Sequence, residues 1–174
     1  MYSSIKKSKA RPGDWLAILG AGGGLGHIGD KKQELCMSLG ATKFLDFRKE
    51  DIVQSAKAAT SGLGVHGVIC TANGEKAYEQ SMQMLRPLGT LVCVGIPHIP
   101  FRLPATPFEM IVKGLSIVGN SAGTAQEMDE LLAMALAGDV KAHIEVFELQ
   151  EIVDVLQRLE RSEIEGRAVL KIPV

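Results

Sequence analysis

Short apolar runs alternate with segments of helical periodicity along this chain, and that alternation limits the fold more than any other feature. The clearest runs are WLAIL at 15–19, HGVIC at 66–70 and GTLVCVGI at 89–96. They are not interrupted by a polar residue at every second position, so we expect burial on both faces, as in parallel sheets covered by helices. The sequence therefore predicts an α/β fold with a Rossmann-like, doubly wound parallel sheet.

Weaker signals complete this pattern and predict one domain over residues 1–174. Further strands are expected at KFLDF (43–47), GLSIVG (114–119) and RAVLKI (167–172). Helices are expected at 30–39, 49–60, 75–86 and 148–161. Another helix is expected to start at a capping box of Thr124 and Glu127, to end at Gly138, and to place Met128, Leu131, Leu132 and Leu136 inward.

Charge and cysteine content narrow the class of protein. The formal net charge is −1, which favours neither nucleic acid nor an anionic membrane surface. No stretch reaches the roughly 20 apolar residues of a membrane span. The three cysteines, Cys36, Cys70 and Cys93, are odd in number and far apart, so they predict free thiols in a reducing compartment, the cytoplasm.

A glycine-rich turn, GAGGGLG at 20–26, follows the first expected strand. Glycines at this place allow a tight turn and a close approach of backbone N–H groups to a pyrophosphate. The strict G-x-G-x-x-G spacing fails because Leu25 stands where a glycine is needed, but a form one residue longer fits. The candidate cofactor-binding residues of this turn are Gly20, Gly23, Gly24, Leu25 and Gly26. A glycine-rich turn that holds no ligand is the alternative.

The second half of a dinucleotide fingerprint is an acidic residue about 20 positions further on, which binds a ribose hydroxyl. Asp46 lies at that distance from Gly26. Spacing alone therefore nominates Asp46.

Three segments carry a family resemblance: GAGGGLGH at 20–27, TANGEKAYEQSMQMLRPLGTLVCVGIP at 71–97, and SIVGNSAGTAQEMDELL at 116–132. Together they resemble the zinc-dependent alcohol dehydrogenases of the medium-chain family, of the fungal and bacterial type. The resemblance extends over essentially the whole chain. It implies a nucleotide-binding portion that takes NAD or NADP.

The resemblance also assigns roles to individual positions. It implies that Thr71 lies beside the middle of the cofactor, and that Gly95 and Ile96 lie beside the nicotinamide. It further implies that Asn120 and Ser121 face the carboxamide and that Arg167 pairs with the pyrophosphate. Inheritance of the scaffold without present use is the alternative for each position.

Two departures from the family are expected. The family's zinc-bearing catalytic domain corresponds to sequence before Met1, and no C-x-x-C or clustered histidine set occurs here, so we expect no bound zinc. After Gly26 the chain continues directly into DKKQELCMSLG, so one helix, one strand and the ribose-binding acid are expected to be missing. The resemblance implies that Asp46 matches a later strand of the family, so its distance from Gly26 is a coincidence.

Three functions remain open. The first is a nicotinamide-binding oxidoreductase portion that cannot oxidise alcohols alone. The second is a small non-redox enzyme for isomerisation, dehydration or cyclisation, with acid–base groups drawn from His27, Asp30, Asp46 and His98. The third is an interaction module that forms a homo-oligomer through the strand at 114–119.

Overall fold

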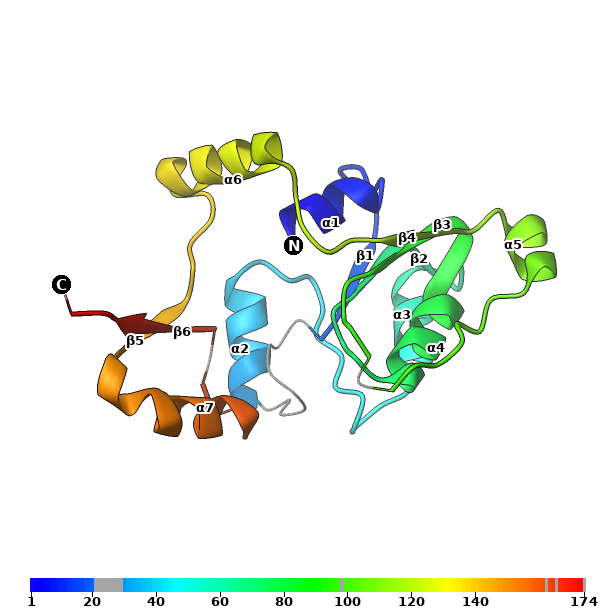
Figure 1. Cartoon of the computed structure of the whole chain (residues 1–174). Helices are drawn as coiled ribbons and strands as arrows, with labels where there is room; N and C mark the ends of the chain where they lie inside the picture. Colours follow the sequence, from blue (N-terminus) through cyan, green and yellow to red (C-terminus); the bar gives the residue numbers. More distant parts are fainter. Residues whose placement is uncertain (21–29, 98, 162, 165, 174) are drawn as a thin grey trace. The chain divides into compact units, whose positions relative to one another are not determined.

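In the computed structural model the residues described are 1–20, 30–97, 99–161, 163–164 and 166–173 (Figure 1). The chain divides into two compact units. The first unit comprises Met1–Ala21 and Leu45–Met128, and the second comprises Gly22–Phe44 and Asp129–Val174. The single domain expected over 1–174 stays a prediction. No helix within the described ranges has the length and apolar character needed to cross a membrane.

A four-stranded parallel sheet forms the centre of the first unit, in the order β1-β2-β3-β4. Its strands are β1 (Leu16–Leu19), β2 (Val65–Cys70), β3 (Leu85–Cys93) and β4 (Ser116–Gly119). The last pairs in register are Leu19 with Cys70, Cys70 with Cys93, and Cys93 with Gly119. All four strands therefore end level with one another, and the α/β parallel fold predicted from the sequence is confirmed.

Helices α3 (Ile52–Ala59) and α4 (Glu75–Met84) pack together, and α4 also lies against β2 and β3 (Figure 1). The Asp51 carboxylate accepts hydrogen bonds from the N–H groups of Val53 and Gln54 and so begins α3. The buried side chains of these helices and of the sheet form one core: Ile52, Val53, Ala56, Val65, Val68, Cys70, Tyr78, Met82, Met84, Leu85, Leu91 and Leu115.

Two shorter helices complete the first unit, α1 (Tyr2–Lys7) and α5 (Pro107–Lys113). The chain just after α1 lies close to β2, because a Cβ added at Gly67 would lie 3.2 Å from the Ser8 Cβ. Thr106 and Glu109 form a capping box that starts α5, and Gly114 ends this helix with φ of 61°.

The second unit contains α2 (Asp30–Ser38), most of α6 (Ala125–Ala137), and a separate pair of parallel strands. The strands are β5 (Ile144–Glu148) and β6 (Arg167–Lys171), joined through the 3-10 turn η1 (Leu149–Glu151) and α7 (Ile152–Glu160). Sequence analysis did not predict β5. Its residues, IEVFE, alternate between exposed and half-buried positions, so this strand lacks the continuous apolar character used to find the others.

Two expectations about individual elements were wrong. Residues 43–47 form no strand, because Asp46 organises a turn there and no described strand pairs with the outer side of β1. The expected inward stripe of α6 is not buried: Met128, Leu132 and Leu136 are 56%, 53% and 90% exposed. The capping box that starts this helix is confirmed, since Thr124 N donates to the Glu127 carboxylate and Glu127 N to the Thr124 hydroxyl.

Candidate functional site: the carboxyl edge of the sheet

The carboxyl ends of β1, β2, β3 and β4 make one edge, and the backbone hydrogen bonds between strands continue past it. Thr71 N donates to Leu19 O at 2.9 Å, Val94 N to Cys70 O at 3.0 Å, and Asn120 N to Cys93 O at 2.9 Å. Open α/β sheets bind ligands outside the carboxyl ends of their strands. The segments beginning at Gly20, Thr71, Val94 and Asn120 are therefore the candidate site.

Gly20 turns the chain directly above Thr71. Its φ is 84°, and a Cβ there would lie 2.6 Å from the Thr71 hydroxyl oxygen and 3.0 Å from Ala72 N. The Thr71 hydroxyl donates to Leu19 O at 2.7 Å, which fixes that oxygen in place. A side chain at position 20 would need both a strained backbone and a displaced Thr71, so the turn requires glycine.

At Gly95 the backbone after β3 lies even closer to the backbone after β2. A Cβ at this position would overlap the carbonyl group of Ala72, and it would lie 2.7 Å from Thr71 O. Gly95 N also donates to Cys70 O at 2.9 Å. The peptide after β3 is thus held against the peptide after β2, which leaves bare backbone at the middle of the edge.

Tyr78 supports this arrangement from α4, a role that sequence analysis missed because Tyr78 reads as one member of an apolar helical stripe. Its hydroxyl donates to Gly95 O at 2.6 Å, and its ring packs against Phe101 with centroids 5.4 Å apart. Burial raises the pKa of Tyr78 to about 12. The phenol therefore keeps its proton and remains a hydrogen-bond donor at neutral pH.

Asn120 is committed to a structural contact. Its Oδ1 accepts from Lys7 Nζ at 2.8 Å and from Ser3 Oγ at 3.3 Å, and its Nδ2 donates to Ser4 Oγ at 2.7 Å. This buried side chain holds α1 to the end of β4, so only its backbone faces the edge. The neighbouring Ser121 is exposed, and so is Ile96 after β3.

Asp46 organises a turn and is only 6% exposed. Its Oδ1 accepts from Arg48 N at 3.0 Å, and the Arg48 and Lys49 side chains lie 3.5 and 3.9 Å from its carboxylate. The hydrogen bond from Arg48 N is the largest cause of a pKa below the ordinary value. An ionised carboxylate occupied in this way is poorly suited to proton transfer, so the non-redox hypothesis gains nothing from Asp46.

The remaining predicted site residues lie outside the described residues or in the second unit. Gly23, Gly24, Leu25, Gly26, His27 and His98 lie outside the described residues, as does the side chain of Asp30. Arg167 begins β6 in the second unit, where its N–H donates to His143 O at 3.0 Å. The edge therefore unites Gly20, Thr71, Gly95, Ile96, Asn120 and Ser121.

Metal-binding groups are not gathered in the part of the chain that the structure describes. No three His, Cys, Asp or Glu side chains there lie close enough to hold an ion. Burial raises the pKa of the Cys70 and Cys93 thiols, which disfavours the thiolate form that binds zinc. The described residues do not fit a zinc site.

Comparison with known proteins decides the family. A family profile described as zinc-binding dehydrogenase matches residues 27–137. The chain belongs to this family. The resemblance to medium-chain alcohol dehydrogenases, drawn from three motifs, is thereby confirmed.

Individual relatives support the same assignment. The chain is 38% identical to an alcohol dehydrogenase of Geobacillus stearothermophilus, over 98% of this chain and 54% of the relative. It is 38% identical to an alcohol dehydrogenase of Schizosaccharomyces pombe, over 97% of this chain and 53% of the relative. The crystal structure of an alcohol dehydrogenase from Aeropyrum pernix superposes with a TM-score of 0.86 at 30% identity, over 99% of this chain and 54% of that one.

This zinc-binding dehydrogenase chain spans about half the length of the curated relatives it matches. The alignment with the Geobacillus relative runs over 188 residues, which is longer than the 174 residues present here. That relative therefore has residues within the matched region that this chain lacks, in agreement with the expected internal shortening.

Replacing Gly95 with Ala tests the contact between the two backbones. Because the new Cβ would overlap Ala72, we expect Gly95→Ala to lower the free energy of unfolding by about 2–4 kcal/mol, a value typical of overpacking with backbone strain. Gly119→Ala is the matched control, since a Cβ at Gly119 has no atom within 4 Å. Urea unfolding followed by circular dichroism measures both, and equal effects of the two variants would contradict this account.

Asp46 gives the stability a pH dependence. Its folded pKa is depressed, so its contribution is present above the ordinary pKa of 3.8 and is lost as pH falls through the folded value. We expect Asp46→Asn to be less stable than wild type at pH 6 and to match it near pH 2–3, because the wild-type carboxyl is then protonated. Urea unfolding from pH 2 to 6 measures this. The exposed Asp139→Asn should follow wild type throughout, and a constant deficit for Asp46→Asn would exclude the charge as its cause.

Proposed function

We propose that this chain is the cofactor-binding portion of an alcohol dehydrogenase-like oxidoreductase and that it holds NAD or NADP along the carboxyl edge of its sheet. The observation that carries the proposal is the pair of close backbone contacts at Gly20 and Gly95. Without side chains at these two positions, a flat extended ligand gains access to the backbone over β1, β2 and β3. We also propose that the protein acts in the cytoplasm, since Cys36, Cys70 and Cys93 are all free thiols.

The residues have distinct parts in this proposal. The turn that begins at Gly20 after β1 would receive the pyrophosphate through backbone N–H groups. The peptides at Gly95 and Ile96 would lie beside the nicotinamide, with Tyr78 holding the Gly95 carbonyl in position. Bound there, the nicotinamide would supply a hydride acceptor for the oxidation of an alcohol, a reaction that also needs a base for the hydroxyl proton.

The chain alone should not complete that reaction, because the described residues fit no zinc and Asp46 is unsuited to take the hydroxyl proton. The expected loss of the ribose-binding acid also weakens cofactor binding. A hydrogen bond to a charged group contributes about 1.5–3 kcal/mol, so its absence lowers affinity roughly 10- to 200-fold. We therefore propose weak but saturable nicotinamide binding without turnover.

Titration with NADH and NADPH, followed by fluorescence or calorimetry, tests this proposal. We expect saturation with a dissociation constant of roughly 10 µM to 1 mM, and at least tenfold weaker binding for Gly95→Ala because its backbone is displaced. Gly74→Ala is the control, since a Cβ there meets no atom within 4 Å. Purified protein with ethanol, NAD and added zinc should give no NADH absorbance. Absence of binding at millimolar cofactor would refute cofactor binding, and alcohol oxidation that co-purifies with the chain would refute its inactivity.

We propose, second, that two copies of the chain associate through β4. This strand ends the sheet, and no described strand pairs with its outer side. Helix α5, which precedes β4 in the chain, exposes apolar side chains, with Phe108 and Ile111 73% and 79% exposed. An unpaired strand edge is a template for pairing with a second copy, and exposed apolar groups favour association.

Analytical ultracentrifugation across protein concentrations tests the dimer. We expect a dimer at micromolar concentration and at least a tenfold weaker association for Val118→Lys, because paired β4 strands bring two added charges close together. Val112→Lys on α5 is the control for charge, since Val112 is 65% exposed and lies outside the strand. A monomer at all concentrations would refute the dimer, and equal weakening by both variants would refute the β4 contact.

A further inference from the structure

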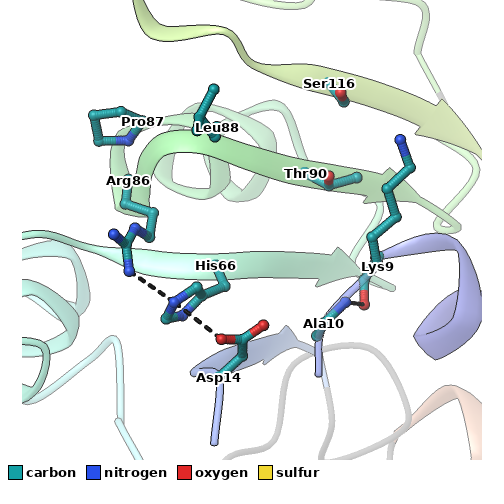
Figure 2. A pocket seen from close by; sticks show the side chains of 10 residues that line it. Lys9, Ala10, Asp14, His66, Arg86, Pro87, Leu88, Thr90 and Ser116 are labelled. Carbon is teal, nitrogen blue, oxygen red and sulfur yellow. Dashed lines mark hydrogen bonds and ion pairs between the residues drawn. The ribbon is translucent and has the colours of Figure 1, made fainter. Parts of the chain in front are cut away.

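A pocket of about 270 Å³ opens at the opposite end of the sheet, where β2, β3 and β4 begin (Figure 2). It belongs entirely to the first unit. Its polar and charged lining comes from Ser8 and Lys9 after α1, Asp14 before β1, and His66, Arg86, Thr90 and Ser116 on the strands. Pro87 and Leu88 add an apolar wall. No part of the proposed cofactor edge contributes to it.

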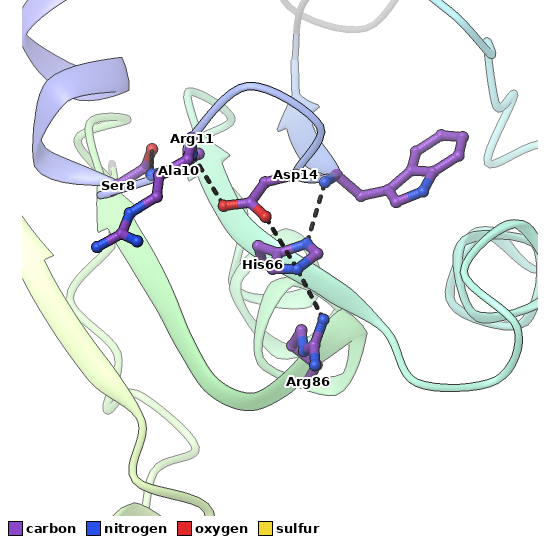
Figure 3. A network of polar contacts seen from close by, with 7 residues as sticks. Ser8, Ala10, Arg11, Asp14, His66 and Arg86 are labelled. Atoms are coloured by element: carbon purple, nitrogen blue, oxygen red, sulfur yellow. Dashed lines mark hydrogen bonds and ion pairs between the residues drawn. The ribbon is translucent and has the colours of Figure 1, made fainter.

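His66 lies at the centre of a polar network (Figure 3). Trp15 N donates to His66 Nδ1 at 3.0 Å, and His66 Nε2 lies 3.1 Å from Asp14 Oδ1. Arg86 Nη1 lies 2.7 Å from the same Nε2. The other carboxylate oxygen of Asp14 accepts from Arg11 N at 2.9 Å.

The three contacts of His66 cannot all be hydrogen bonds. Because Nδ1 accepts the Trp15 N–H, it carries no proton, and a neutral imidazole then has its proton on Nε2. Nε2 can only donate in that tautomer, and Asp14 is the acceptor that faces it. Arg86 also has only donors, so its short contact with Nε2 brings two donors together instead of satisfying the guanidinium.

The two cations of the pocket, Lys9 and Arg86, thus lack a free carboxylate acceptor among the described residues that line it. Asp14 already accepts from Arg11 N and lies 3.1 Å from His66 Nε2, and Lys9 makes no ion pair among the described residues. Figure 2 shows Arg86 at one side of the pocket and Lys9 at the other, with Thr90 between them. Two cations facing one pocket with a single occupied carboxylate leave a net positive charge, which an anion would neutralise.

We propose that this pocket binds the phosphate group of a small phosphorylated ligand. The planar fork of Arg86 suits two phosphate oxygens, Lys9 supplies a second charge, and the hydroxyls of Thr90 and Ser116 are further donors. The space exceeds the size of one phosphate, so an organic remainder has room against Pro87 and Leu88. Binding would draw Arg86 away from His66 and relieve the contact between donors.

Isothermal calorimetry with inorganic phosphate and with glycerol 3-phosphate, at constant ionic strength, tests the proposal. We expect saturable binding to wild type that is at least tenfold weaker in Arg86→Gln and in Lys9→Met. Arg102→Gln removes an exposed charge away from the pocket and should leave binding unchanged. If glycerol 3-phosphate binds more tightly than inorganic phosphate, the site is assigned to a phosphomonoester. If the two bind with equal affinity, the site is assigned to free phosphate. NADH affinity should be the same in all variants, since the cofactor edge lies at the other end of the strands.

Absence of saturable binding, or equal weakening by Arg102→Gln and Arg86→Gln, would overturn the proposal. If Arg86→Gln does not fold, the exposed Lys9→Met decides alone. Nitrogen-15 NMR of His66 provides an independent test, because the proposal requires the proton on Nε2. A proton on Nδ1 would make the Arg86 contact an ordinary hydrogen bond, and the surplus of donors would disappear.

Discussion

The contact between the peptide at Gly95 and the backbone of Thr71 and Ala72 sets the shape of the carboxyl edge. Because the two chain segments touch without an intervening side chain, the strand ends stay level and their hydrogen bonds continue beyond the sheet. The same requirement appears at Gly20 above Thr71. Both glycines exclude Cβ atoms from the surface where a flat cofactor would lie, so packing of the fold and access to backbone groups have a common cause.

The sequence predicted best where a segment's environment is set by its own composition. The uninterrupted apolar run at 89–96 is largely β3, and Thr124 with Glu127 starts α6 through contacts only three residues apart. It predicted poorly where the outcome depends on a distant partner. KFLDF has strand-forming residues, but no described strand pairs with it, and the turn around Asp46 takes its place. The stripe on α6 is apolar, yet Leu136 is 90% exposed because apolar spacing does not supply the surface that would cover it.

The candidate site also contains some residues that could be predicted from the sequence and others that could not. Glycine positions were predictable from the turn motif and the family resemblance, because steric demands on glycine leave a mark in the sequence. The structural use of Asn120 was not, since its partners Ser3, Ser4 and Lys7 lie more than 110 residues away. The Arg86–His66–Asp14 network was invisible for the same reason. Family membership, in turn, locates the edge of the sheet where a dinucleotide is expected and says nothing about the opposite end.

Tyr78 couples α4 to the carboxyl edge through a phenol that must keep its hydrogen. The pKa of this phenol is about 12 when folded against an ordinary value of 10, so alkali first ionises the unfolded form. The contribution of Tyr78 is complete below pH 10 and is lost as pH rises toward 12. In an ultraviolet titration, the phenolate absorbance of Tyr78 should develop only well above pH 10, and this delayed signal would report the opening of the edge around Gly95. One of the two tyrosines of this chain is thus an intrinsic optical probe of the place where the cofactor is proposed to bind.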